Sequence, residues 1–148
     1  MPQFLRHPAS QPRIEPIPTK RAIPFVYTIG NQESPSLKKY NRYLDTPLNS
    51  FPLDETLFQK IPEFKRDTII PLLSILHLED DFVYREETVD GVQTGQYLFS
   101  TPVPSSNATN SLKVIIIDGL DHQYPNGFIH PVVLADYLWD FFARHKLP

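Results

Sequence analysis

The sequence predicts an α/β fold built on a mainly parallel sheet that includes a β-hairpin. Three observations lead to this prediction: two apolar runs of strand length, one Asp-Gly hairpin signal, and two amphipathic stretches with helical spacing. Strands that are apolar on both faces are typical of sheets covered by helices. A chain of 148 residues, 41% of them hydrophobic, is long enough for one domain with a substantial core.

The two apolar runs are the predicted buried strands. Residues 22–29 form a nearly continuous run of β-branched and aromatic side chains that ends at Gly30. Residues 112–117, Leu-Lys-Val-Ile-Ile-Ile, give the clearest strand signal in the chain. Both runs have the length of a buried strand rather than that of a helix.

A hairpin is predicted between residues 82–88 and 95–101, which are strand-like segments. The sequence Val89-Asp90-Gly91-Val92 separates them. Asp-Gly favours the positive φ angles of a tight primed turn, so the two segments are expected to pair in antiparallel orientation.

Two helices are predicted, over residues 63–78 and from about residue 130 to 145. Apolar residues recur at intervals of three and four in both, and Pro71 is expected to kink or split the first. Pro131 suits the first turn of the second helix, because a backbone N–H at that position would have no acceptor within the helix. Trp139 and the aromatic stripe of this helix are expected to pack in the core.

The rest of the chain is rich in proline, with sixteen prolines against five glycines. Residues 1–21 are polar and punctuated by prolines, which predicts an extended or disordered lead-in, so the domain portion is 22–148. Residues 36–44 are expected to form a short helix and residues 45–62 an irregular excursion.

Composition excludes several classes of function. The absence of cysteine excludes disulfides, zinc–thiolate centres and cysteine nucleophiles. A net charge of −3 argues against a nucleic-acid partner. No run approaches a membrane span and no secretory signal is visible, so we expect a cytoplasmic protein without a membrane partner. No cofactor or metal is expected, because ligands as close together as Asp118, Asp121 and His122 rarely converge on one ion without a fourth from elsewhere.

A carboxylate and an imidazole follow the two predicted buried strands. The strand over 22–29 leads to Glu33, and the strand over 112–117 leads to His122. Ligands of open α/β sheets bind outside the carboxyl ends of the strands, where these side chains could meet as orienting acid and general base. The spacing alone favours two solvated loop residues instead, because loops are normally rich in such side chains.

The C-terminal stretch resembles a known enzyme group. Asp118-Gly119-Leu120-Asp121-His122-Gln123-Tyr124-Pro125, followed by a helix that contains Leu138-Trp139-Asp140-Phe141-Phe142, resembles the end of the polyhydroxybutyrate-depolymerase/feruloyl-esterase group of α/β-hydrolases. This resemblance implies the C-terminal part of an α/β-hydrolase fold with His122 as the catalytic histidine. Glu33 stands where the group has its aspartate.

The chain contains no Gly-x-Ser-x-Gly elbow, which supplies the nucleophile in this fold. Its glycines four apart, Gly91 and Gly95, enclose Gln93 within the predicted hairpin. We therefore expect the C-terminal segment of a serine carboxylic-ester hydrolase, inactive alone, whose nucleophile comes from a complementing N-terminal segment. The alternative is a non-catalytic α/β remnant that acts as a binding or self-associating module.

Overall fold

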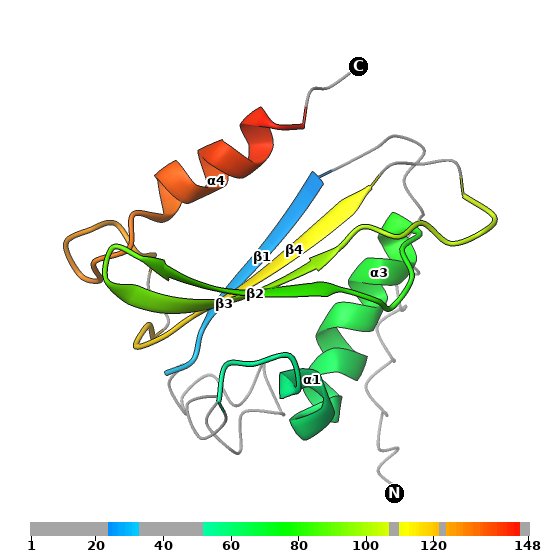
Figure 1. Ribbon diagram of the computed structural model, residues 1–148, viewed down its shortest axis with the longest axis horizontal. Helices are drawn as coiled ribbons and strands as arrows, with labels where there is room; N and C mark the ends of the chain where they lie inside the picture. Colours follow the sequence, from blue (N-terminus) through cyan, green and yellow to red (C-terminus); the bar gives the residue numbers. More distant parts are fainter. Residues whose placement is uncertain (1–23, 33–51, 107–109, 122–123, 146–148) are drawn as a thin grey trace, which may run out of the picture.

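The computed structural model describes a mixed four-stranded sheet with helices on both of its faces (Figure 1). It covers residues 24–32, 52–106, 110–121 and 124–145. The predicted lead-in over 1–21 and the predicted helix over 36–44 lie outside these residues. An α/β fold was predicted, and the described part of the chain has this architecture.

The sheet has the strand order β1-β4-β3-β2. β1 and β4 are parallel, whereas β4 with β3 and β3 with β2 are antiparallel. The prediction of a mainly parallel sheet is therefore wrong for the described strands. The connection over residues 100–110 is too short for the helical crossover that a parallel β3–β4 pair would need. The strands are β1 (Pro24–Gly30), β2 (Val83–Val89), β3 (Val92–Phe99) and β4 (Ser111–Ile117).

The predicted hairpin is confirmed, with strand boundaries a few residues from those expected. β2 and β3 pair from Val83 opposite Leu98 to Val89 opposite Val92. Asp90 and Gly91 occupy the turn with φ angles of 51° and 80°. Both central residues thus adopt the positive φ that an Asp-Gly turn favours.

The predicted first helix is present in pieces on one face of the sheet, and it is preceded by a short helix, α1 (Leu57–Lys60), in the segment that was expected to be irregular. The pieces are α2 (Pro62–Phe64), the π-helical turn η4 (Lys65–Ile69) and α3 (Ile70–Leu76). The wide η4 turn ends at Ile69, two residues before Pro71, whose missing N–H and bulky ring disfavour a regular α-helical bond there. The helix is therefore not split at Pro71, which lies inside α3, but its hydrogen bonding changes from π-helical to α-helical just before this residue.

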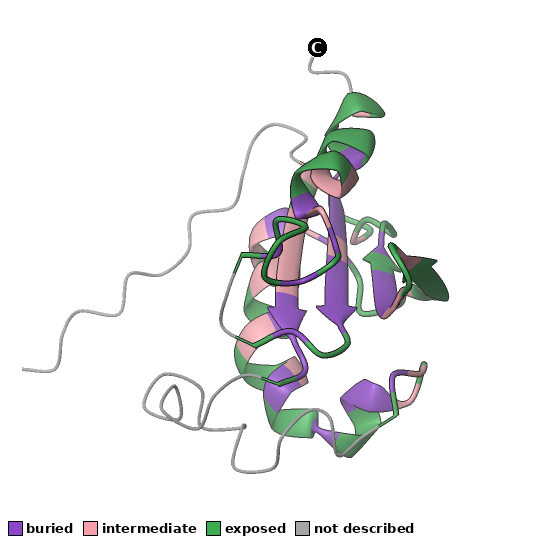
Figure 2. Cartoon of the chain, turned by 90° about the vertical axis from the view of Figure 1, so that its left-hand side faces the viewer, coloured by how far each residue is buried: buried purple, intermediate pink, exposed green. Residues whose placement is uncertain are grey.

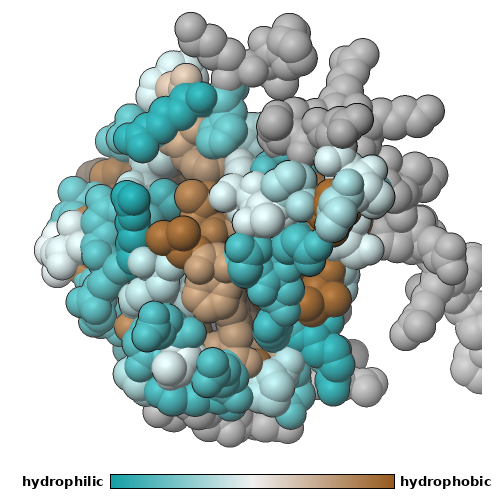
Figure 3. Space-filling view, turned by 45° about the vertical axis from the view of Figure 1, so that its right-hand side comes forward, coloured by the Kyte–Doolittle hydropathy of each residue, from teal (hydrophilic) through white to brown (hydrophobic). Residues whose placement is uncertain are grey.

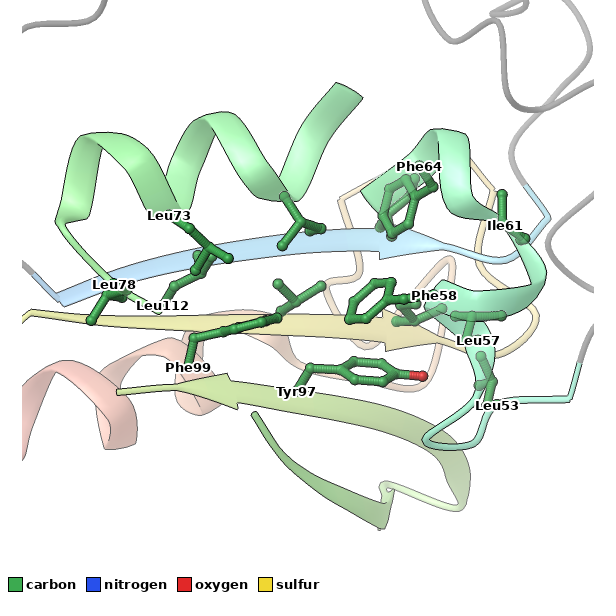
Figure 4. Close-up of a cluster of buried hydrophobic side chains, with 14 of the residues drawn as sticks. Leu53, Leu57, Phe58, Ile61, Phe64, Leu73, Leu78, Tyr97, Phe99 and Leu112 are labelled. Carbon is green, nitrogen blue, oxygen red and sulfur yellow. The ribbon is translucent and has the colours of Figure 1, made fainter. Parts of the chain in front are cut away.

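The main core lies between these helices and the sheet (Figure 4). Phe58 projects from the helical segment onto Tyr97 and Phe99 of β3, and the Phe58 and Tyr97 ring centroids are 4.5 Å apart. Phe64 packs against Phe58 and against Tyr27 of β1. The Tyr97 hydroxyl donates to the Asp54 carbonyl at 2.6 Å, so this buried polar atom is satisfied.

The opposite face of the sheet is covered by α4 (Leu134–Ala143). This helix starts after residue 130, so Pro131 precedes it and the predicted start is wrong. Residues before the helix form a loop instead, because the Gly127 N–H donates to the carbonyls of His130 and Val132.

Trp139 is 73% exposed, so its predicted place in the core is wrong. Leu134 and Phe141 are the buried residues of α4. Trp139 lies five residues after Leu134 and two before Phe141, which places it well round the helix from this buried side. Figure 2 accordingly shows buried residues along β4 and exposed residues over much of α4.

Apolar residues also reach the molecular surface. Figure 3 shows them as a band between hydrophilic residues on one face. Within the described residues, none of the helices has the length and hydropathy needed to cross a membrane.

Candidate functional site

The carboxyl ends of β1 and β4 lie side by side. The two strands pair in parallel from Pro24 opposite Ser111 to Gly30 opposite Ile117, so they end at the same edge of the sheet. This is the edge at which the sequence places Glu33 and His122. Both residues lie outside the described part of the chain, so their convergence remains a prediction.

Asn31 joins the turns that follow the two strands. Its N–H donates to the Ile117 carbonyl at 3.1 Å, and its side-chain Nδ2 donates to Asp118 Oδ1 at 2.7 Å. Its Oδ1 accepts the Gly119 N–H at 2.9 Å. Asn31 is only 4% exposed, and these bonds use both ends of its amide. The side chain therefore fixes one turn against the other.

A close backbone contact reinforces this junction. The Gln32 N–H donates to the Leu120 carbonyl at 2.9 Å. A Cβ on Gly30 would lie 2.0 Å from the same carbonyl oxygen, so only glycine fits at this position. The segments that precede Glu33 and His122 in the chain are thus in direct contact.

His130 connects the loop before α4 to the same junction. Its Nε2 lies 3.0 Å from the Asp118 carbonyl oxygen, which can only accept, so Nε2 carries the proton of this hydrogen bond. Its Nδ1 accepts the Val132 N–H at 3.3 Å. The expectation that His130 starts the terminal helix is wrong, because the buried ring instead holds the preceding loop against the turn after β4.

Sequence reasoning did not identify Asn31 or His130. The available signal for Asn31 was an amide residue directly after the glycine that ends a buried strand. For His130 the signal was weaker, since a histidine before a proline fits a helix start equally well. Both residues form hydrogen bonds to Asp118, which is distant from each of them in the sequence.

The described residues contain no group of three histidine or acidic side chains arranged to hold a metal ion. Asp118 instead bonds to Asn31 through its carboxylate and to His130 through its carbonyl. His122, the third member of the ligand set considered from the sequence, is not among these residues.

A second polar cluster lies between α4 and the hairpin. Tyr137 Oη donates to Glu87 Oε2 at 2.7 Å, and Gln96 Nε2 donates to the same oxygen at 2.8 Å. These two bonds lower the pKa of Glu87, while burial is the main cause of the raised pKa of Tyr137. Gln96 Nε2 also contacts the Tyr137 hydroxyl. The cluster satisfies its own polar groups and attaches α4 to the hairpin.

Lys113 lies beside this cluster, with Nζ 4.8 Å from the centre of the Tyr137 ring. Burial lowers its pKa, and the nearby Glu87 carboxylate opposes that shift. A cation over an aromatic face is a favourable contact, so Lys113 contributes to holding α4 on the sheet.

Ser111 and His145 form a hydrogen bond at the other end of β4. Ser111 Oγ lies 3.0 Å from His145 Nε2, and His145 Nδ1 lies 2.8 Å from the Phe141 carbonyl oxygen. Ser111 begins β4, whereas the candidate site lies beyond its last residue, Ile117. This part-buried pair therefore attaches the end of α4 to the sheet and does not belong to the candidate site.

No protein-family model matches the sequence, and no curated protein or solved structure is significantly similar to it. The candidate site therefore depends on the sequence pattern and on the geometry of the two strand ends. What that geometry provides is a fixed junction from which two loops leave the same edge of the sheet.

Proposed function

We propose that this chain is the C-terminal segment of a serine carboxylic-ester hydrolase of the α/β-hydrolase fold. In this proposal His122 is the general base and Glu33 the acid that orients it. One observation carries the proposal: β1 and β4 are parallel neighbours, and the turns after them are bonded through Asn31 and through the Gln32–Leu120 backbone contact. Loops that begin at one fixed junction are suited to bringing a base and its orienting acid together.

The proposed reaction is acyl transfer through a serine supplied by preceding sequence. The serine oxygen attacks the ester carbonyl carbon while His122 accepts its proton, and the Glu33 carboxylate stabilises the imidazolium. The carbon–oxygen bond to the alcohol then breaks, and His122 returns the proton to the leaving oxygen. A water molecule releases the acid by the same steps, again with His122 as base. Without the serine and oxyanion donors, the chain alone is expected to be inactive.

Hydrolysis of a short-chain p-nitrophenyl ester tests the expected inactivity of the isolated chain. The purified chain and its His122→Ala variant should both give the rate of buffer alone. If the chain hydrolyses the ester and the substitution abolishes that activity, the chain contains its own nucleophile and this part of the proposal is wrong.

Chemical crosslinking tests the proposed convergence of the two side chains. Because the chain has no cysteine, a Glu33→Cys/His122→Cys variant has only the two introduced thiols. A short bis-maleimide should join them within one chain. The matched control is Glu33→Cys/Asp140→Cys, which places the second thiol on an exposed residue of α4. Equal crosslinking of the two variants, or none in either, would contradict the proposed geometry.

The second candidate function is a non-catalytic α/β module that binds a partner or self-associates. It is favoured by the way Asn31, Asp118 and His130 bond to one another, as the residues of a purely structural junction would. The coding sequence directly upstream distinguishes the two functions. A segment that encodes Gly-x-Ser-x-Gly, in frame or shifted, supports the hydrolase, and a lack of one favours the module.

A further inference from the structure

The two edges of the described sheet differ in their chemistry. β2 forms one edge and carries Arg85, Glu86 and Glu87, charges of the kind that prevent one sheet from pairing with another. β1 forms the other edge, and its seven residues, Pro-Phe-Val-Tyr-Thr-Ile-Gly, include no charged side chain. After Pro24, the β1 edge therefore lacks the charged side chains that protect the β2 edge.

The backbone of β1 presents hydrogen-bonding groups at this edge. The Asn31 N–H donates to Ile117 on β4, and residues of a parallel ladder alternate between bonding to one side and to the other. It follows that the N–H groups of Val26, Thr28 and Gly30 point away from β4. Among the described residues, no strand lies on that side to accept them.

Exposed aromatic side chains flank this edge on both faces of the sheet. Tyr137 bonds to Glu87 on β2, so that side of α4 faces the hairpin. At 100° per residue, Phe142 lies about a quarter turn from the Leu134 and Phe141 side of α4, on the flank away from the hairpin, and Trp139 lies further round on the same flank. They are 42% and 73% exposed. On the opposite face of the sheet, Phe25 of β1 is 38% exposed.

We propose that the β1 edge binds the β1 edge of a second copy of this chain. In an antiparallel pair about a two-fold axis perpendicular to the sheet, Val26 lies opposite Thr28 of the partner subunit. Each such pair exchanges both backbone hydrogen bonds. The two α4 helices then lie on the same face of one continuous sheet, so the Trp139 and Phe142 flank meets its own copy.

A second copy fits this edge because the surface is complementary to itself. No like charges meet across the axis, since β1 carries none, and the apolar flank of α4 is covered by an identical flank. The charged β2 strands form the two outer edges of the combined sheet. Growth should therefore stop at a dimer.

Sedimentation equilibrium of the full chain tests this proposal. The expected mass is twice the 17.1 kDa of the single chain. Thr28→Pro removes an outward N–H and should give a monomer, because proline is tolerated on a free edge but cannot donate across a strand pair. Trp139→Ser should weaken the dimer at least about tenfold. The control is Asp140→Ser, on an exposed residue next to Trp139, and it should leave the dimer unchanged.

Three results would overturn the proposal: a monomer at every concentration, assemblies larger than a dimer, or a dimer that neither Thr28→Pro nor Trp139→Ser weakens. Circular dichroism identifies a variant that has unfolded, and the Trp139→Ser variant leaves the β1 backbone intact if Thr28→Pro does not fold. Sedimentation equilibrium measures only the mass of the assembly and does not depend on catalytic activity. Its failure would therefore leave the proposed ester hydrolysis unaffected, and the reverse also holds.

Discussion

Replacing Gly30 with alanine tests the close contact between the turns that follow β1 and β4. The new Cβ would lie 2.0 Å from the Leu120 carbonyl oxygen and 2.5 Å from its carbon. Both are backbone atoms, so no rotation of a side chain relieves the contact. The two strand ends must move apart.

The size of that movement sets the expected loss of stability. Reaching an ordinary contact of 3.4 Å requires a shift of about 1.4 Å, which would break the 2.9 Å bond from the Gln32 N–H to the Leu120 carbonyl. A lost hydrogen bond costs about 1 kcal/mol, and strain from overpacking costs about 1–3 kcal/mol. We expect Gly30→Ala to lower the free energy of unfolding by about 2–4 kcal/mol and Tm by roughly 5–15 °C.

Gly95→Ala is the matched control, because Gly95 is also a strand glycine without a positive φ. The nearest atom to its added Cβ is Leu53 Cβ at 3.4 Å, an ordinary contact. Its free energy of unfolding should change by less than about 1 kcal/mol. Urea and thermal unfolding, followed by far-ultraviolet circular dichroism, measure both variants. Equal stabilities for the two variants would refute the reasoning.

Substitutions at three further positions test the contacts that hold the fold together. Tyr137→Phe should lower stability at pH 7 by about 1–2 kcal/mol. The Tyr137 bond helps lower the pKa of folded Glu87 below its ordinary value of 4.5, so the stabilisation is present above that value and lost as the pH falls through the folded pKa. The difference in Tm between wild type and variant should therefore shrink between pH 7 and pH 3. Asn31→Asp places a second carboxylate against Asp118 and should destabilise the fold by about 2–3 kcal/mol at neutral pH, with partial recovery in acid, whereas Asn31→Ala should show no such recovery. Phe58→Ala removes a fully packed ring and should lower the free energy of urea unfolding by about 3–5 kcal/mol.

The features that were predicted correctly come from the properties of single residues or neighbouring pairs. Asp90-Gly91 forms the hairpin turn because both residues tolerate a positive φ. Pro71 has no N–H for an α-helical bond, and the π-helical turn η4 ends just before it. The apolar run of β4 is buried on both faces, as its composition indicates.

The features that were not predicted depend on partners far away in the chain. The order of strands in the sheet depends on which element packs beside β4, and no local pattern encodes that. The rotation of α4 is another example: the hydrogen bond from Tyr137 to Glu87 turns that side of the helix toward the hairpin and leaves Trp139 exposed. An apolar stripe several residues wide does not determine this orientation by itself.

The candidate site was predicted in part. The sequence indicated two strand ends that carry polar loops, and the structure places those ends at one edge of the sheet. Asn31 and His130 hold the turns after β1 and β4 in place. The sequence did not identify them, because their hydrogen-bonding partners could not be known from residue spacing. Glu33 and His122 lie outside the described residues, so their roles remain predictions.

The parallel pairing of β1 with β4 has a consequence for how the chain folds. Asn31 and Asp118, whose side chains bond at the end of this pair, are 87 positions apart in the sequence. Closing a loop of that length costs more conformational entropy than closing the β2–β3 hairpin. We therefore expect the hairpin and the α3 segment to form early and the β1–β4 pair to form late. The strand ends that carry the candidate chemistry would then be assembled only in the last steps of folding.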